Sequence, residues 1–174
     1  MKATFVSLII MGFHFQIFAQ RPDYSKQCKD AMNELSYFIG DWKGQANVMT
    51  QNGELIVDQT ERIESALGGV AILIEGIGRV HNEIEFNALG IINFDPFTKQ
   101  YKLRSYLKEG LATDAYFKVL EPNKYEWGFD AQAAGKFRYT IKIDPSKRTW
   151  NEVGEMSRDG NAWMKIIELN LVKK

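Results

Sequence analysis

After residue 40 the chain consists of short runs rich in β-branched and aromatic residues, and in several of them apolar and polar residues alternate with a period of two. Tyr125, Trp127 and Phe129, for example, are separated by Glu126 and a glycine. This spacing is typical of a β-strand with one apolar face, because successive side chains of a strand point to opposite sides. We therefore expect strands at 41–50, 54–66, 70–80, 84–95, 101–108, 111–120, 125–130, 136–144, 149–157 and 163–172.

Turn-forming residues separate these segments, including the pairs Asn52-Gly53, His81-Asn82 and Asp159-Gly160. Asn-Gly and Asp-Gly pairs suit tight hairpins because these residues tolerate a positive φ. With no helix between the strands, parallel βαβ units are excluded. The pattern predicts an all-β fold, an up-and-down antiparallel barrel of about ten strands, since closure removes exposed strand edges. A two-sheet sandwich is the alternative that the same pattern permits.

One helix is predicted ahead of the strands, at 25–38, with Ser25 as its N-cap and Gly40 just beyond its end. Apolar residues recur within it at spacings of four and three, at Cys28, Met32, Leu35 and Phe38. Cys28 lies on this apolar stripe, so we expect a packed thiol rather than a reactive one.

The first 19 residues have the layout of a secretory signal peptide: Lys2, then an apolar run over 5–18, then the small residue Ala19. A buried N-terminal helix is the alternative. We expect 20–174 to form one barrel domain, exported to the periplasm or the cell exterior. No second long apolar run follows, so no membrane span is expected. The single cysteine allows no internal disulfide.

Charge and composition exclude several function classes. The chain has 22 basic and 22 acidic residues and no basic tract, which argues against nucleic-acid binding. Its two histidines are His14 and His81, the second in a predicted turn, so neither a serine–histidine–acid site nor a clustered zinc site is expected. We predict no cofactor and no metal, and we name no catalytic residue.

Four ionisable residues stand in otherwise apolar strands: Glu75, Arg104, Glu152 and Glu168. Burying an unpaired charge is costly, so they either face water or meet inside the barrel, with Arg104 as the counter-ion. If they face inward, they could join Trp42, Trp127 and Tyr139 in lining a site for an amphipathic small molecule. The sequence leaves the orientation open.

Several motifs resemble those of known barrel families. The opening GDWKG at 40–44 is similar to the G-x-W start of calycins. The segments EGIG at 75–78, ALGIINFD at 88–95, LRSY at 103–106, WNEVGE at 150–155 and ELNL at 168–171 resemble the DUF1579 family of lipocalin-like barrels, although Asn93 and Phe94 replace that family's glycine and tyrosine. The resemblance implies a lipocalin-like architecture. The chain resembles nitrobindin-type barrels more distantly. Those proteins bind haem through a histidine near the end of the chain, and this sequence has no histidine after His81.

Three functional hypotheses follow. The leading one is an exported protein that binds or carries a small apolar or amphipathic ligand in the barrel. The second is a barrel hydrolase or isomerase that uses Glu152 or Glu168 as a general base. The third is a structural or interaction protein whose barrel is filled by side chains. The identity of the ligand and the oligomeric state stay open.

Overall fold

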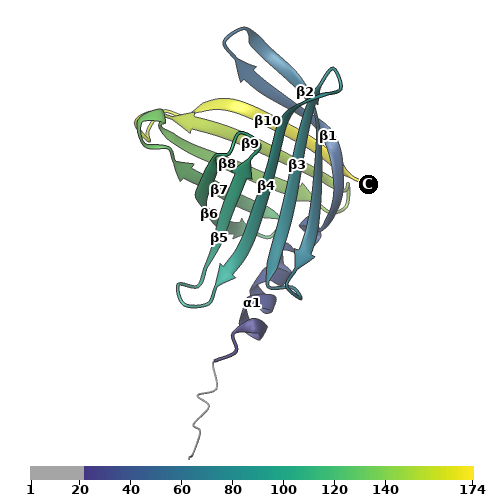
Figure 1. The fold of residues 1–174 in the computed structure, drawn as a ribbon, viewed down its shortest axis with the longest axis vertical. Coiled ribbons are helices and arrows are strands. Elements are labelled where there is room, and N and C mark those ends of the chain that lie inside the picture. The colour runs from purple at the N-terminus through teal and green to yellow at the C-terminus, as the bar shows by residue number, and fades with distance from the viewer. Residues whose placement is uncertain (1–21) are drawn as a thin grey trace, which may run out of the picture.

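The computed structural model describes residues 22–174, and the predicted signal peptide lies outside them. The described chain forms a closed barrel of ten antiparallel strands, which confirms the predicted fold class (Figure 1). Every predicted strand is confirmed to within one residue at each end. The strands are β1 Gly40–Thr50, β2 Gly53–Ala66, β3 Ala71–Val80, β4 Glu83–Asp95, β5 Gln100–Leu107, β6 Ala112–Glu121, β7 Lys124–Asp130, β8 Lys136–Asp144, β9 Thr149–Ser157 and β10 Met164–Lys173.

Each strand pairs with its neighbours in sequence, and β1 pairs with β10 to close the barrel. The closing register runs from Trp42 opposite Lys173 to Val48 opposite Ile167. The hairpin at His81-Asn82 has positive φ at both residues, 50° and 71°, as a two-residue turn that matches strand twist requires. His81 is exposed there, as predicted.

The predicted helix is present but differs in form. An α-helix, α1 Ser25–Met32, continues into a 3₁₀-helix, η1 Asn33–Phe38. The prediction of Ser25 as the N-cap was wrong, because Tyr24 occupies that position. The Asp23 carboxylate accepts a hydrogen bond from the Ser25 N–H at 2.8 Å. The tighter 3₁₀ turns carry the apolar stripe onward, so that Leu35 and Phe38 are both buried.

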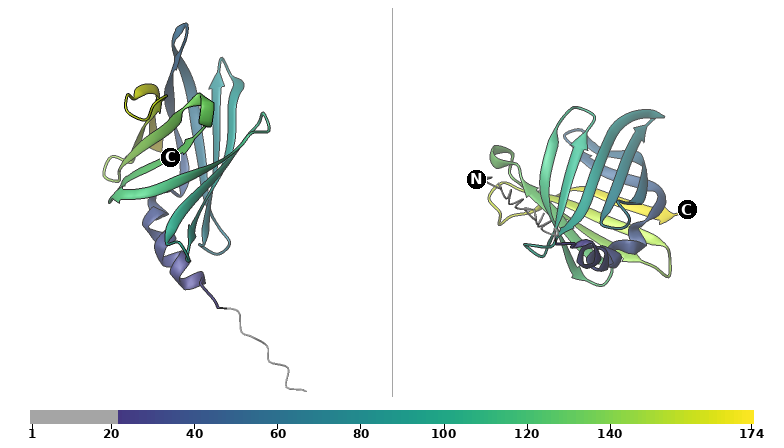
Figure 2. Two further views of the ribbon diagram at one scale, coloured as in Figure 1. Left: turned by 90° about the vertical axis from the view of Figure 1, so that its left-hand side faces the viewer. Right: turned by 60° about the horizontal axis from the view of Figure 1, so that its bottom comes forward.

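The helical segment lies at one end of the barrel, below the strands in the view of Figure 1 and at the near end in the right-hand view of Figure 2. The Tyr101 hydroxyl on β5 donates to the Ala31 carbonyl at 2.7 Å, and Lys173 Nζ on β10 donates to the Tyr37 carbonyl at the same distance. The Cys28 thiol is buried and lies 3.6 Å from the Phe94 carbonyl, as its place on the apolar stripe predicted.

An aromatic cluster forms the floor of the barrel at this end. Phe38 packs against Tyr125 and Trp150, with ring centroids 4.7 and 5.0 Å apart, and Trp150 meets Trp42 edge-on at 5.5 Å. Trp42 is fully buried, and its indole N–H donates to the Phe38 carbonyl at 2.8 Å. Such aromatic pairs stabilise a fold beyond the area that they bury, so this end of the barrel is well packed.

The opposite end is different. Leu55, Phe86 and Met164 occupy positions that share the inward face of their strands, yet they are 39%, 42% and 60% exposed. Because large apolar side chains on an inward face are normally covered, their exposure means that none of the described residues covers the barrel at this end. The barrel thus has a packed floor and an accessible mouth.

Candidate functional site

Two carboxyl groups lie inside the barrel above the floor. Glu61 on β2 is 8% exposed and Glu152 on β9 is 6% exposed. Each follows the alternation of its strand: Glu61 stands two residues before the buried Ile63, and Glu152 two residues after the buried Trp150. They lie close enough for the charge of Glu152 to act on Glu61.

Glu152 is held by two tryptophans. The indole N–H of Trp127 on β7 donates to one carboxylate oxygen at 2.9 Å, and that of Trp150 donates to the other at 3.1 Å. Burial raises the pKa of Glu152 to about 7, although both hydrogen bonds favour the ionised form. Near neutral pH this carboxyl group can therefore be found with or without its proton.

Glu61 is held by Gln59, two residues earlier on β2, whose side-chain N–H donates to Glu61 Oε1 at 2.6 Å. Burial raises the pKa of Glu61 to about 8, and the charge of Glu152 raises it further against the opposing effect of the Gln59 hydrogen bond. A Cβ atom added at Gly76 on β3 would lie 2.8 Å from Glu61 Oε2. The absence of a side chain at Gly76 therefore leaves room for the Glu61 carboxyl group.

An aromatic wall stands beside the carboxyl pair. Trp127 stacks face to face on Tyr139 of β8, with ring centroids 3.9 Å apart and planes 5° from parallel. Both side chains are only half-buried although both face inward. Burial and the charge of Glu152 raise the pKa of Tyr139 to about 12, so its hydroxyl stays neutral.

Three polar atoms of this cluster have no hydrogen-bond partner within residues 22–174: Gln59 Oε1, Glu61 Oε2 and the Tyr139 hydroxyl. In that part of the chain, every fully enclosed side-chain nitrogen or oxygen has a partner. The three atoms must therefore touch accessible space. Buried side chains with unpaired polar atoms are rare in native structures, so this cluster is the candidate site.

The structure brings together three of the residues predicted from sequence, Trp127, Tyr139 and Glu152. Trp42 faces inward as well, but it belongs to the packed floor, where its indole N–H is already satisfied by Phe38. Trp42 therefore has no free polar group to offer to a ligand beside the carboxyl pair.

The other three predicted residues lie on the outside, which corrects the inward arrangement considered for them. Arg104 pairs with Asp114 at 2.7 Å on the outer face and is not a counter-ion to an interior carboxylate. Glu75 is exposed on β3. Their strands place the neighbouring residues Leu103, Ile72 and Ile74 inward, and alternation turns the charged positions to water.

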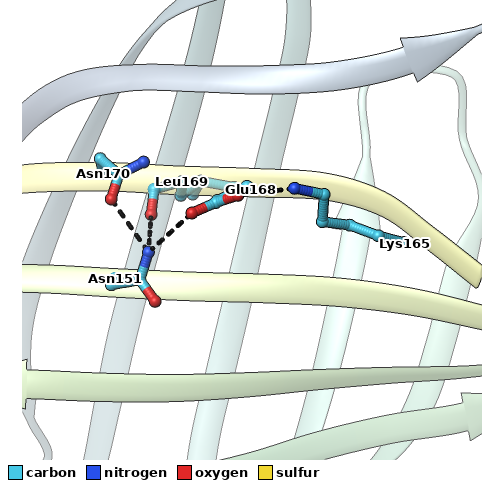
Figure 3. A network of polar contacts seen from close by, with 5 residues as sticks. All are labelled: Asn151, Lys165, Glu168, Leu169 and Asn170. Carbon is cyan, nitrogen blue, oxygen red and sulfur yellow. Dashed lines mark hydrogen bonds and ion pairs between the residues drawn. The ribbon is translucent and has the colours of Figure 1, made fainter.

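Glu168 also faces outward, as Figure 3 shows: it meets Lys165 at 2.8 Å and the Asn151 amide at 3.4 Å. The apolar pair that precedes it does not indicate burial, because a register shift between Lys165 and Ile167 breaks the alternation of β10. Leu169, the next residue, is the one that points inward.

Sequence reasoning missed Gln59, Glu61 and Trp150. A signal was present: Val57, Gln59, Glu61 and Ile63 share one face of a strand whose first and last members are apolar. The glycines of EGIG lie opposite the two polar residues, with Gly76 paired to Glu61 and Gly78 to Gln59. Polar residues within an apolar stripe, faced by glycines, mark the cluster.

Two hollows occur on the outer wall. One, of about 400 Å³, is lined by Ile91, Arg104 and Asp114 among others, and a second, of about 260 Å³, by Arg62, Glu75 and Leu89 among others. The charged residues that line them lie on the outer face of the sheet, although the first hollow also reaches the inward-facing residues Leu103 and Ala115. Within residues 22–174 no three His, Cys, Asp or Glu side chains are grouped to hold a metal ion.

No family model matches the chain, and the search of curated proteins found no match. Among the residues that the structure describes, no helix has both the length and the apolar character needed to cross a membrane.

Proposed function

We propose that this protein binds a small apolar or amphipathic molecule inside the barrel, with the carboxyl cluster at the inner end of the site and the exposed apolar residues at its mouth. The observation that carries the proposal is the set of unpartnered oxygen atoms on Gln59, Glu61 and Tyr139, which border accessible space inside a closed barrel. A barrel completely filled by its own side chains would have paired or excluded them, which argues against a purely structural role.

The first test uses fluorescence. Trp127 borders the proposed site, whereas Trp163 lies on the outer wall, where the Arg138 guanidinium covers its ring at 4.1 Å. Fatty acids, sterols and porphyrins titrated into the protein should change tryptophan emission, and Trp127→Phe should remove most of that change while Trp163→Phe keeps it. The proposal fails if no compound of the panel alters either the emission or the melting temperature.

A second test fills the interior. Ala88 on β4 lies inward opposite Gly76 and is half-buried, whereas the next residue, Leu89, is exposed on the outer wall. Ala88→Phe should reduce the affinity for a bound compound roughly tenfold, about 1.4 kcal/mol, while Leu89→Phe should leave it unchanged. Equal affinities in the two variants, measured by calorimetry, would place the ligand elsewhere.

Export is part of the proposal and rests on the apolar run over 5–18 and the small residue Ala19. The resemblance to DUF1579-like barrels supports the same assignment to a lipocalin-like binding protein. Native mass spectrometry of protein isolated from its own cell envelope tests both points at once. A mature mass that begins near residue 20, together with a retained adduct, is the expected result.

A second candidate function is catalytic. Two interior carboxyl groups with pKa values near 7 and 8 could serve as general base and general acid at neutral pH. The enzyme would be a hydrolase or isomerase acting in the barrel. Glu152→Gln would then abolish a turnover found in a substrate screen, whereas a binding protein would show no turnover to lose.

A further inference from the structure

The interior carboxyl pair has no positive partner within the described chain. The ion pairs between residues 22 and 174 all join side chains on the outer surface, and neither Glu61 nor Glu152 takes part in one. From residues 22–174, both groups accept hydrogen bonds only from neutral donors, an amide and two indoles. A buried carboxylate is usually paired with a cation, and without one the carboxyl group tends to keep its proton. Within residues 22–174 the neighbouring strands supply no such cation.

The groups around the pair reinforce this reading. Among residues 22–174, Tyr139 on β8 is the other titratable group whose pKa responds to Glu152, and its hydroxyl is neutral. The strands between and beside the two carboxyl groups present apolar or small residues, namely Trp42 and Ala46 on β1, Gly76 and Gly78 on β3, and Leu169 on β10. No lysine or arginine of the described part of the chain is among the causes that shift the pKa of either carboxyl group.

The polar atoms without a hydrogen-bond partner in this cluster are all oxygens. Gln59, which is 4% exposed, and Glu61, which is 8% exposed, each direct an unpartnered oxygen into accessible space. The amide oxygen of Gln59 is an acceptor, and Glu61 Oε2 becomes one when the carboxyl group loses its proton. The oxygen of the Tyr139 hydroxyl can accept as well. Beside them stands the stacked wall of Trp127 and Tyr139, and aromatic rings attract cations through their electron-rich faces.

We infer that the ligand is an amphipathic organic cation whose ammonium group lies between Glu61 and Glu152 and whose apolar part extends toward Leu55 and Phe86 at the mouth. This inference rests on the proposed binding function and names the class of ligand. An anionic ligand such as a fatty acid would bring a third carboxylate toward two that already repel each other, so it should bind worst.

Cation binding should release a proton. Without ligand, Glu61 is largely neutral at pH 7, since its pKa is raised to about 8. An ammonium group beside it favours the carboxylate, so the O–H bond of the acid breaks and the proton passes to the buffer. A neutral ligand gives no such release.

The experiment compares three ligands with the same ten-carbon chain, below their micelle concentrations, by calorimetry on the purified protein: decyltrimethylammonium, 1-decanol and decanoate. We expect the cation to bind at least roughly tenfold more tightly than the alcohol at pH 8, and decanoate to bind most weakly. Because a quaternary ammonium keeps its charge at every pH, its affinity should rise between pH 6 and pH 9 while that of decanol stays level. In buffers of different ionisation enthalpy, only the cation should show proton release.

Variants locate the effect. Glu61→Gln and Glu152→Gln keep the shape of the side chain and should each reduce cation affinity roughly tenfold without weakening decanol. Glu75→Gln, on the outer wall, is the matched control and should change neither. Decanol or decanoate binding as tightly as the cation would overturn the inference and leave the binding function standing. Failure of all three ligands, with no quenching by the wider panel, would overturn both.

Discussion

At the scale of single residues, the feature that sets this barrel apart is a pair of carboxyl groups that share its interior with neutral partners only. Burial outweighs the hydrogen bonds from Gln59, Trp127 and Trp150, so the pKa values of both carboxyl groups are raised rather than lowered. The free energy of folding is therefore linked to pH through these two groups.

The direction of that linkage can be tested at Glu61. Its folded-state pKa of about 8 lies above its ordinary 4.5, so its contribution to stability is complete below pH 4.5 and is lost as the pH rises to about 8. Glu61→Gln cannot ionise, and its free energy of unfolding should fall less between pH 5 and pH 9 than that of the wild type. We expect a difference of more than about 1.4 kcal/mol, the equivalent of one pKa unit.

Urea denaturation at pH 5, 7 and 9 measures this difference. Glu75→Gln serves as the control for charge removal on the outer wall, and its pH profile should follow the wild type. Parallel profiles for wild type and Glu61→Gln would mean that Glu61 is ionised in the folded state already, contrary to its surroundings.

At the scale of elements, the pairing of β1 with β10 decides whether the barrel closes. Gly44 lies at this seam, opposite Leu171, and a Cβ atom added there would come within 1.9 Å of the Asn170 carbonyl oxygen. The approach of the two backbones is too close for any side chain, so the strands would have to separate. This is a requirement for glycine that strand propensity alone does not indicate.

Gly44→Ala should therefore lower the free energy of unfolding by about 2–4 kcal/mol. Gly90→Ala is the matched control: it is also a strand glycine, but its added Cβ would meet Leu103 and Ile74 at 3.5 and 3.6 Å, ordinary contact distances. That variant should change stability by less than about 1 kcal/mol. Similar losses in both variants would show that the seam is more adaptable than its geometry indicates.

At the scale of the whole molecule, closure leaves none of the ten strands with an unpaired edge. The first and last strands, β1 and β10, close the barrel by pairing with each other. Unfolding of either strand therefore opens the barrel. We expect a single cooperative transition in which tryptophan fluorescence and far-ultraviolet circular dichroism have the same midpoint. Separate midpoints would indicate that a group of strands unfolds independently.

The sequence alone was sufficient for the fold because short-range signals determine it. Runs rich in β-branched and aromatic residues, several of them alternating with a period of two, placed the strands, and turn residues such as Asn52-Gly53 placed the hairpins. The residues of the candidate site were harder to predict. Glu152 was found since it interrupts an apolar strand, but Glu61 lies between Thr60 and Arg62 in a stretch that resembles a solvated strand. Which strands face each other across the interior is a long-range property, and only the closed geometry brings Glu61 to Glu152.

The helical segment and the aromatic floor occupy one end of the barrel, while the other end is accessible. The barrel is thus closed at one end and uncovered at the other. If the proposed ligand binds there, it would have to enter and leave through the same end. Residues at the rim, such as Leu55 and Phe86, would then control its rates of association and dissociation, whereas Glu61 and Glu152 near the base would determine which ligands bind.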